Sequence, residues 1–502
     1  MIIAHDLGTT GDKASLHAND GRTLATCTID YPTRFAPGGV AEQDPDHWWR
    51  AVGEASRQLL RRAGVDADAV QGIGLSGQMM GAVFLDEDLQ SVRPAIIWAD
   101  HRSTAQTAQL LNTVGMESAY AELGHRINPT YTLSKVMWVR DNQPELWAHT
   151  RHVCLTKDLI TLRLTGTLLT DPSDASGTNA YDQTKGVWST RMLQAAGIDE
   201  RVLPPIVAST TVAGGLTGEA ATHLGLRSGT PVVVGGGDGP MAAVGSGVVA
   251  PADGAYVCLG SSSWISVTSK KPLLDPGMRS MTFDHVLPHS YVPTATMQAG
   301  AACLQWVIEL FSPAGTAPHA YDSLLAAAGE VTAADEGLFF LPHLLGERSP
   351  YWNPAASGVF AGVGRHHSRG HMVRAVLEGV AFNLRTCIGA FTDGGIPVER
   401  VDVIGGGARS DVWLQVLADV WGVPVRRRSI IKEANCLGAA VTALVGLGIA
   451  SGFQIARELS TTTAEFTPHT SRSLRYTEQH AIFLDAYARL EPWFDTRTGD
   501  PR

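Results

Sequence analysis

The stretch IIAHDLGTTGDKASLHA (residues 2–18) decides the fold, because it runs from an apolar strand through a glycine turn into a second strand. Asp6 ends the first strand, the turn carries Gly8, Thr9 and Thr10, and Lys13 follows just beyond it. Such turns present free backbone N–H groups, which bind anions and phosphate above all. A carboxylate beside a phosphate is repelled unless a cation lies between them. The stretch therefore indicates magnesium and a nucleotide, although a Gly-Thr hairpin can also be only a turn.

A second stretch, AYVCLGSSSWISVTS (residues 255–269), repeats this plan of strand, glycine, hydroxyl residues and return strand. Two similar domains facing each other across a cleft would place the two hairpins on opposite sides of one ligand. Gly-Ser hairpins are common, so a chance likeness stays open at this point. The small-residue segment GSGVVAPADG (245–254) predicts the boundary between domains over residues 1–247 and 248–502.

Composition limits the classes of function. The 502 residues, 44% of them hydrophobic and 18% charged, suffice for two or three globular domains. A formal net charge of −10 argues against a general nucleic-acid or membrane binder. The six cysteines contain no CxxC pair, and neither a signal peptide nor a membrane-spanning run is visible. We therefore expect a cytoplasmic protein without nucleic-acid or membrane partners.

Strands and helices alternate over most of the chain, which predicts an α/β fold. One helix is expected to start after Asp44 and to stop at Gly64. The segment PVVVGGGDGPMAAVGSG (231–247) is predicted to be a buried strand, a glycine turn and a helix start. Asp238 in this turn could be a general base that takes a proton from a substrate hydroxyl. It could equally be the N-cap of the helix, and this window alone does not separate the two.

A third glycine turn, IGGGARSDVW (residues 404–413), also joins a strand to a helix. Its bare backbone could hold an adenosine, or it could only allow strand and helix to pack closely. Other motifs are absent or unsuitable. No Gly-Lys pair exists for a Walker A loop, and GIGLSG (72–77) leads into a strand rather than into a helix. HHSRGH (366–371) has three histidines but no fitting carboxylate or cysteine, so a solvated helix start is expected there rather than a zinc site.

Taken together, these segments resemble the FGGY carbohydrate kinases from about residue 2 to about residue 450. The hairpin at 2–18 is similar to the family's phosphate hairpin, and TLSKVMWVRDN (132–142) is close to its first signature. GVFAGVGRHHSRGHMVRAVLE (358–378) fits the second signature in full, with Gly358, Gly362, His371, Ala375 and Glu378 in step. GGGD (235–238), LGSSS (259–263) and IGGGARS (404–410) resemble its catalytic, second phosphate and adenosine segments.

The resemblance implies two actin-like, ribonuclease-H-like domains around a central cleft, and transfer of the γ-phosphoryl group of ATP, with Mg²⁺, to a hydroxyl of a ketose or polyol. Asp238 would accept the hydroxyl proton, and Asp6 and Asp238 would hold the metal. The remaining implied contacts are Gly8, Thr9, Thr10, Lys13, Gly260, Ser261 and Ser262 for the phosphates, Gly405, Gly406, Gly407 and Ala408 for adenosine, and Gln78, Met79, Met80, Asp238 and Gly239 for the acceptor.

Within the family the segments look closest to xylulokinases, which makes D-xylulose the expected acceptor. Two positions depart from that pattern, since Met80 stands where His is usual and Gly239 where Asn is usual. Another ketose, a polyol or a sugar acid is therefore the alternative acceptor, and an actin-like ATP-binding assembly protein is a more distant alternative. The family also allows a homodimer. After residue 451 no motif is assigned, and EQHAIFLDAYARLEPWF (478–494) is expected to form an amphipathic helix.

Overall fold

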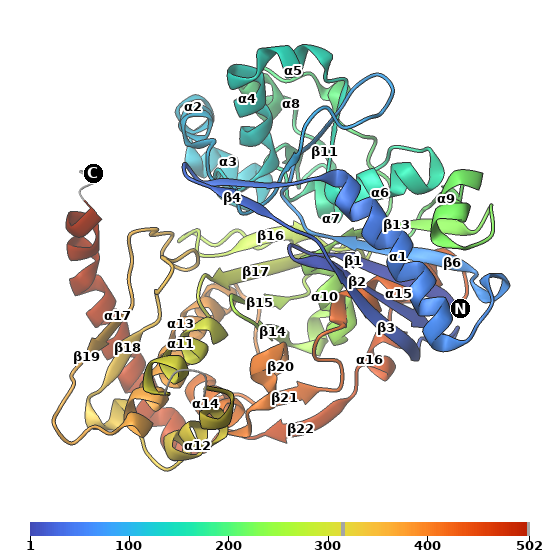
Figure 1. Cartoon of the computed structure of the whole chain (residues 1–502). Helices are drawn as coiled ribbons and strands as arrows, with labels where there is room; N and C mark the ends of the chain where they lie inside the picture. Colours follow the sequence, from blue (N-terminus) through green and yellow to red (C-terminus); the bar gives the residue numbers. More distant parts are fainter. Residues whose placement is uncertain (313–316, 499–502) are drawn as a thin grey trace.

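Two mixed β-sheets form the core of the molecule, one from each half of the chain (Figure 1). The computed structural model describes residues 1–312 and 317–498. The first sheet has the strand order β12–β13–β6–β1–β2–β3. Its strands are β1 (Ile2–Leu7), β2 (Gly11–His17), β3 (Thr23–Asp30), β6 (Gly72–Gly77), β12 (Val212–Gly215) and β13 (Pro231–Gly237).

The second sheet has the order β16–β17–β15–β14–β20–β21–β22. Its strands are β14 (Ala255–Leu259), β15 (Ser263–Val267), β16 (Met281–Asp284), β17 (Tyr291–Met297), β20 (Val401–Ile404), β21 (Val425–Arg428) and β22 (Thr462–Phe466). Short strands pair outside the two main sheets. They are β4 (Arg34–Ala36), β5 (Val40–Gln43) and β8 (Ala95–Ile96), β7 (Val83–Leu85) with β9 (His152–Cys154), β10 (Tyr181–Asp182) with β11 (Val187–Trp188), and β18 (Phe339–Leu341) with β19 (Val359–Ala361).

The two predicted hairpins occupy equivalent positions in the two sheets. Strand β1 pairs antiparallel with β2 and parallel with β6. Strand β14 likewise pairs antiparallel with β15 and parallel with β20. The strand pairing therefore confirms the repeat that the two glycine-hydroxyl turns indicated in the sequence.

Helices pack around both sheets. In the N-terminal half they are α1 (Pro45–Ala63), α2 (Thr104–Val114), α3 (Met116–Leu123), α4 (Thr132–Asn142), α5 (Pro144–His149), α6 (Thr156–Thr165), α7 (Pro172–Ala175), α8 (Thr190–Ala196) and α9 (Gly218–Leu224). In the C-terminal half they are α11 (Ala301–Phe311), α12 (Ala317–Gly329), α13 (Arg369–Asp393), α14 (Asp411–Trp421), α16 (Ile455–Leu459) and α17 (Thr470–Thr498). None of the helices within the described residues has the length and apolar character needed to cross a bilayer.

Helices α10 (Asp238–Ser246) and α15 (Ala434–Gly446) pack against each other between the two sheets (Figure 1). Glycines allow this close approach. A Cβ atom on Gly245 would lie 1.8 Å from the carbonyl oxygen of Ala434, and one on Gly438 would lie 2.1 Å from that of Met241. Helix α15 also packs on β1 and β6, so a late segment of the chain covers the first sheet and joins the two halves.

Two helices expected from the sequence are confirmed. Helix α1 begins after Asp44, whose side chain accepts a hydrogen bond from the N–H of Asp46, and ends at Gly64 in the left-handed conformation with φ of +64°. Helix α17 contains the predicted amphipathic segment. Its Phe483 and Phe494 are buried in the core of the C-terminal half, which explains why an apolar stripe follows the last motif.

Candidate active site

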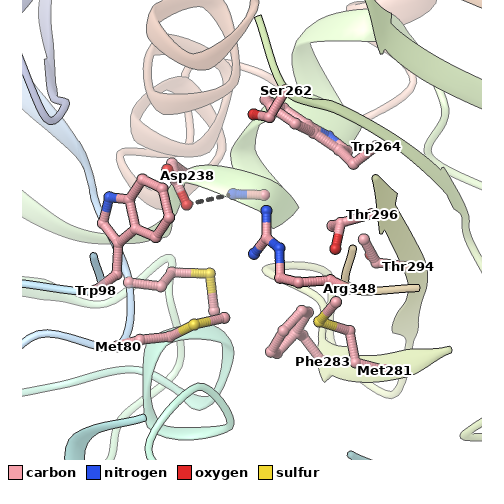
Figure 2. Close-up of a pocket in the computed structure, with 12 residues that line it drawn as sticks. Met80, Trp98, Asp238, Ser262, Trp264, Met281, Phe283, Thr294, Thr296 and Arg348 are labelled. Carbon is pink, nitrogen blue, oxygen red and sulfur yellow. Dashed lines mark hydrogen bonds between the residues drawn. The ribbon is translucent and has the colours of Figure 1, made fainter. Parts of the chain in front are cut away.

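Most residues that line a cavity of about 140 Å³ follow, or lie in, strands of the two main sheets, and Trp98 and Arg348 come from loops outside them. Figure 2 shows Asp238 and Met80 on the side of the first sheet and Ser262, Trp264 and Thr296 on the side of the second. The full lining is Met79, Met80, Trp98, Asp238, Gly239, Ser262, Trp264, Met281, Phe283, Thr294, Thr296 and Arg348. The structure thus brings together predicted catalytic, phosphate and acceptor residues that lie far apart in sequence.

Asp238 is the first residue of α10, directly after β13. The N-cap position belongs to Gly237, and Oδ1 of Asp238 accepts a hydrogen bond of 2.9 Å from the N–H of Gly239. The N-cap alternative for Asp238 is therefore wrong. Partial removal from water raises the pKa of this carboxyl to about 7, and repulsion from Asp6 contributes in the same direction. A carboxylate with this pKa can accept a proton near neutral pH.

The three glycines before Asp238 are required by packing. Gly235 has φ of +75°, and a Cβ atom there would lie 1.8 Å from the carbonyl oxygen of Leu75. A Cβ atom on Gly237 would lie 2.6 Å from Sδ of Met79. Only glycine therefore lets the end of β13 approach β6 and the acceptor loop closely enough to bring Asp238 into the cavity.

A buried charge cluster holds the backbone just before Asp238. The Nζ atom of Lys157 lies 2.7 Å, 3.0 Å and 3.5 Å from the fully buried carboxylates of Asp158, Asp171 and Asp174, respectively. Burial alone would lower the pKa of Lys157, but the three carboxylates raise it. Ser173 donates to Oδ2 of Asp171 at 2.5 Å and accepts from the N–H of Gly237 at 3.0 Å. This chain of contacts fixes the turn that carries Asp238.

Asp6 lies at the end of β1 and is 2% exposed. Its Oδ1 accepts hydrogen bonds from Ser76 at 2.9 Å and from Asn435 at 3.2 Å, while its Oδ2 lies 3.8 Å from Nζ of Lys13. The charge of Asp6 raises the pKa of Lys13, which keeps the ammonium group protonated. Carboxylate oxygens are the ligands that Mg²⁺ prefers, so the oxygens of Asp6 and of nearby Asp238 fit this metal chemically.

Both hairpin turns offer backbone N–H groups. In the first turn the carbonyl oxygens of Gly8 and Thr9 are engaged by Tyr31 at 2.5 Å and by Gln43 at 2.6 Å. In the second turn the carbonyl oxygens of Gly260 and Ser261 accept from the N–H groups of residues 301 and 300, both at 2.7 Å. Within the described residues, no hydrogen bond uses the N–H of Thr9, Thr10, Ser261 or Ser262. The carbonyls are thus held back while amides remain for a phosphate.

The third glycine turn follows β20 and is tightly packed except at one residue. Gly405 has φ of +89°, and a Cβ atom there would lie 2.8 Å from the carbonyl oxygen of Leu259. Gly407 and Ala408 are buried, whereas Gly406 is exposed and has open space at its Cβ position. Of the four residues assigned to adenosine, Gly406 is therefore the one with surface available to a ligand.

The predicted acceptor residues Gln78, Met79 and Met80 follow β6, and of these the two methionines line the cavity while Gln78 has a structural role. Gln78 is 1% exposed, does not line the cavity, and donates to Oε1 of Gln43 at 2.7 Å. Because Gln43 holds the first phosphate turn, Gln78 supports that turn rather than reaching the cavity. Met80 does line it, with an uncommon φ of +66°, and its carbonyl oxygen accepts from buried Lys135 at 3.1 Å. Desolvation lowers the pKa of this signature lysine to about 7.

Several lining residues escaped the sequence analysis, among them Trp98, Trp264, Met281, Phe283 and Arg348. Trp98 donates from Nε1 to Oγ1 of Thr9 at 2.8 Å, so it joins the first phosphate turn to the cavity wall. Trp264 lies on β15 of the second hairpin, whereas the other four come from loops and strands without glycine motifs. Trp98 lies in IIWADHRS (96–103) and Arg348 in FLPHLLGERSP (340–350), and the resemblance of these two segments to xylulokinase segments is the signal that could have found them.

His366 and His367 lie just before α13 and His371 lies in its first turn, which agrees with the expected helix start. The expectation that no carboxylate fits them is wrong, because Oε1 of Glu336 lies 3.1 Å from Nε2 of His371. Nδ1 of His367 accepts from the N–H of Gly364, and Nδ1 of His371 accepts from that of Ser368. Both rings therefore keep the proton on Nε2, whereas a metal-bound histidine donates its second ring N–H. This arrangement favours a capped helix start over a metal centre.

Comparison with known proteins agrees with this geometry. The N-terminal domain model of the FGGY family of carbohydrate kinases matches residues 1–245, and the C-terminal domain model matches residues 255–447. The xylulose kinase of Escherichia coli is 36% identical over 88% of this chain and 89% of its own length. The gluconokinase of Bacillus subtilis is 30% identical over 98% of this chain and 96% of its own length. The crystal structure of xylulose kinase from Rhodospirillum rubrum superimposes with a TM-score of 0.91 at 31% identity, covering 98% of this chain and 99% of that one.

The fold and the site thus define an ATP-dependent carbohydrate kinase with two actin-like, ribonuclease-H-like domains. The chain belongs to the FGGY family of carbohydrate kinases. The expected fold class and reaction class are confirmed, and the more distant alternative, an assembly protein without a sugar substrate, is set aside.

Proposed function

We propose that this kinase phosphorylates D-xylulose, with Asp238 as the general base and with Mg²⁺ as the metal of its ATP. The observation that carries the proposal is the position of Asp238 in a cavity that Ser262 of the second turn also lines (Figure 2), with the pKa of Asp238 raised to about 7. The support for D-xylulose comes from the relatives named xylulose kinases, which include those with 36% and 31% identity.

In the proposed reaction the acceptor hydroxyl gives its proton to a carboxylate oxygen of Asp238 as its oxygen bonds to the γ-phosphorus of ATP. The bond from the γ-phosphorus to the bridging oxygen breaks, and ADP leaves. Phosphoryl transfer depends mostly on positioning and on stabilisation of the phosphoryl oxygens. The amides of Thr9, Thr10, Ser261 and Ser262 would bind these oxygens from two sides, and Lys13 would add a positive charge. Gly406 would lie against the adenosine.

Asp6 and Asp238 would hold the magnesium ion. When bound, this ion supplies positive charge to the phosphate oxygens. Within this chain the residues around Asp6 prepare the site: Ser76 and Asn435 orient one carboxylate oxygen, and the other is left toward Lys13. The weak ion pair of 3.8 Å between Asp6 and Lys13 can open when phosphate arrives.

The first test is ADP release from Mg-ATP with a panel of ketoses, pentitols, tetritols and sugar acids. We expect D-xylulose to stimulate ADP release most strongly. Selective stimulation by a different member of the panel would contradict D-xylulose and would assign Met80 and Gly239 to a changed acceptor pocket. A reaction with magnesium replaced by calcium serves as the control for metal-dependent turnover.

We also propose that the protein lies in the cytoplasm and assembles as a homodimer. All six cysteines are free, and Cys258 is half-buried while the other five are buried, which supports a reducing compartment. Size-exclusion chromatography with light scattering would decide the oligomeric state.

A further inference from the structure

The acceptor side of the cavity is mostly apolar, with few polar groups. Side chains of Met79, Met80, Met281 and Phe283 form much of its wall, and the hydroxyls of Thr294 and Thr296 lie on β17. Arg348 is the positively charged residue of the lining, and Figure 2 shows its guanidinium group pointing into the space next to Asp238. A sugar carries many oxygen atoms, and only a few polar groups of this cavity can form hydrogen bonds with them.

Within the described residues, no hydrogen bond or ion pair joins the guanidinium of Arg348 to another side chain, and its Nε is enclosed without an acceptor. The preceding carboxylate, Glu347, is occupied elsewhere. It accepts from His343 at 2.9 Å, from Asn383 at 3.0 Å and from the N–H of Gln298 at 2.7 Å.

The arginine is nevertheless held in place. Its guanidinium carbon lies 5.8 Å from the ring centre of Trp98, whose own Nε1 is fixed by Thr9. Glu347, anchored by three other groups, fixes the backbone on its other side because it accepts from the N–H of Arg348 at 2.9 Å. A positioned guanidinium with free N–H donors is suited to an oxygen that carries negative or partial negative charge, and it binds two oxygens at once when they lie in one plane.

We propose that Arg348 binds the trigonal oxygen end of the acceptor, which is the carbonyl of a ketose or the carboxylate of a sugar acid. This assignment rests on the proposed sugar-kinase function and makes Arg348 a specificity-determining residue. It supplies the hydrogen bonds that Met80 and Gly239 cannot make. A polyol, which has neither a carbonyl nor a carboxylate, is then a poor acceptor. The competing role for Arg348 is binding of the transferred phosphoryl group.

The test compares three acceptors of the same carbon skeleton: D-xylulose, xylitol and D-xylonate. Each is assayed with the wild type, with Arg348→Lys and Arg348→Met, and with Arg126→Met. Arg126 is a matched control, because it is also half-buried and lies 5.6 Å from a tryptophan ring, that of Trp352, yet does not line the cavity.

For Arg348→Met we expect kcat/KM to fall about 10- to 100-fold for D-xylulose and by at least about 100-fold for D-xylonate, since charge-assisted hydrogen bonds are lost. The fall for xylitol should stay below about threefold, so the preference for carbonyl over polyol collapses. Arg348→Lys should restore part of it, and Arg126→Met should leave it unchanged. An equal fall for all three acceptors, or a rise in KM for ATP alone, would overturn the proposal and favour phosphoryl binding.

Failure of the proposed function is distinguishable from failure of this inference. If no member of the set is phosphorylated, binding of the same three compounds without ATP is followed by the fluorescence of Trp98 and Trp264, which line the cavity. Tighter binding of D-xylulose or D-xylonate than of xylitol, lost in Arg348→Met, would support the assignment without turnover. Equal or absent binding of all three would overturn it.

Discussion

The two predicted phosphate turns occupy equivalent positions in the two sheets, but only the first hairpin carries charged side chains. On β1 and β2, Asp6 is paired in register with Lys13, whereas the corresponding pair on β14 and β15 is Cys258 and Trp264. Both turns keep unengaged amides, since these follow from the hairpin itself. In the proposed mechanism, the duplicated hairpins would therefore supply the phosphate contacts, while side chains on the first sheet would supply metal binding and proton transfer.

Substitution of Asp238, which follows strand β13 of the first sheet, should have the largest effect on the roles proposed for the side chains of that sheet. Asp238→Asn should lower kcat by about 10²–10⁴-fold, because the amide cannot take the proton from the acceptor. ATP affinity, measured by isothermal titration, should change by less than about threefold. Near-normal turnover of this variant would mean that the charged side of the cleft does not contain the base.

Asp6 and Cys258 test the comparison as a matched pair. Asp6→Ala should lower kcat by at least about 100-fold and should not be rescued by more acceptor, because the loss lies in metal binding. Cys258→Ala removes the side chain from the equivalent strand of the second sheet and should change kcat by less than about threefold. Steady-state kinetics at varied magnesium concentrations measure kcat of both variants. Rescue of Asp6→Ala by acceptor alone, or an equal loss in Cys258→Ala, would contradict the unequal roles of the two hairpins.

Much of this architecture is predictable from the sequence, because glycines at special backbone positions leave a local signal. The turns at Gly8, Gly260 and Gly405, and the run that ends at Gly237, all lie where strands meet the cleft. At Gly235 and Gly405 a positive φ and a carbonyl oxygen within 3 Å of the Cβ position explain why no other residue serves. The helix stop at Gly64 is predictable for the same reason.

The acceptor wall is less predictable, because its residues depend on tertiary packing rather than on local pattern. Phe283 and Arg348 lie more than sixty residues apart and meet only when β16 and the loop after β18 are folded. Gln78 shows the converse case, since it precedes two lining methionines in sequence, but its side chain hydrogen-bonds to Gln43 and does not line the cavity. The role of Glu336 beside His371 also required a contact across 35 residues.

The raised pKa of Asp238 predicts that both the rate and the stability depend on pH through this group. A general base must be deprotonated, so kcat/KM for the acceptor should fall about tenfold for each pH unit below about 7. Stability changes in a defined direction too. The folded state keeps a proton on Asp238 between the ordinary pKa and about 7, where the unfolded chain has lost it, so stability declines as pH rises through this range.

The pH prediction is measured by rate profiles and by thermal unfolding of the wild type and Asp238→Asn between pH 5 and 8. The variant should lack both the limb near pH 7 in its residual rate and the decline in melting temperature that belongs to Asp238. A flat wild-type rate profile from pH 6 to 8 would show that the base titrates elsewhere.

Gly239→Asn changes the acceptor part of the cavity and should produce the smallest effect on kcat/KM among these variants. Gly239 lines the cavity, and a Cβ atom there would lie 3.9 Å from Sδ of Met79, so a side chain fits without a clash. Asparagine would add donors and an acceptor next to Asp238, and one net hydrogen bond contributes about 1 kcal/mol. We expect kcat/KM for D-xylulose to rise about fivefold and KM for ATP to stay constant. The melting temperature serves as the control for folding. An unchanged or lower kcat/KM at constant stability would mean that the acceptor passes this position without contact, leaving Arg348 as the main polar group on that wall.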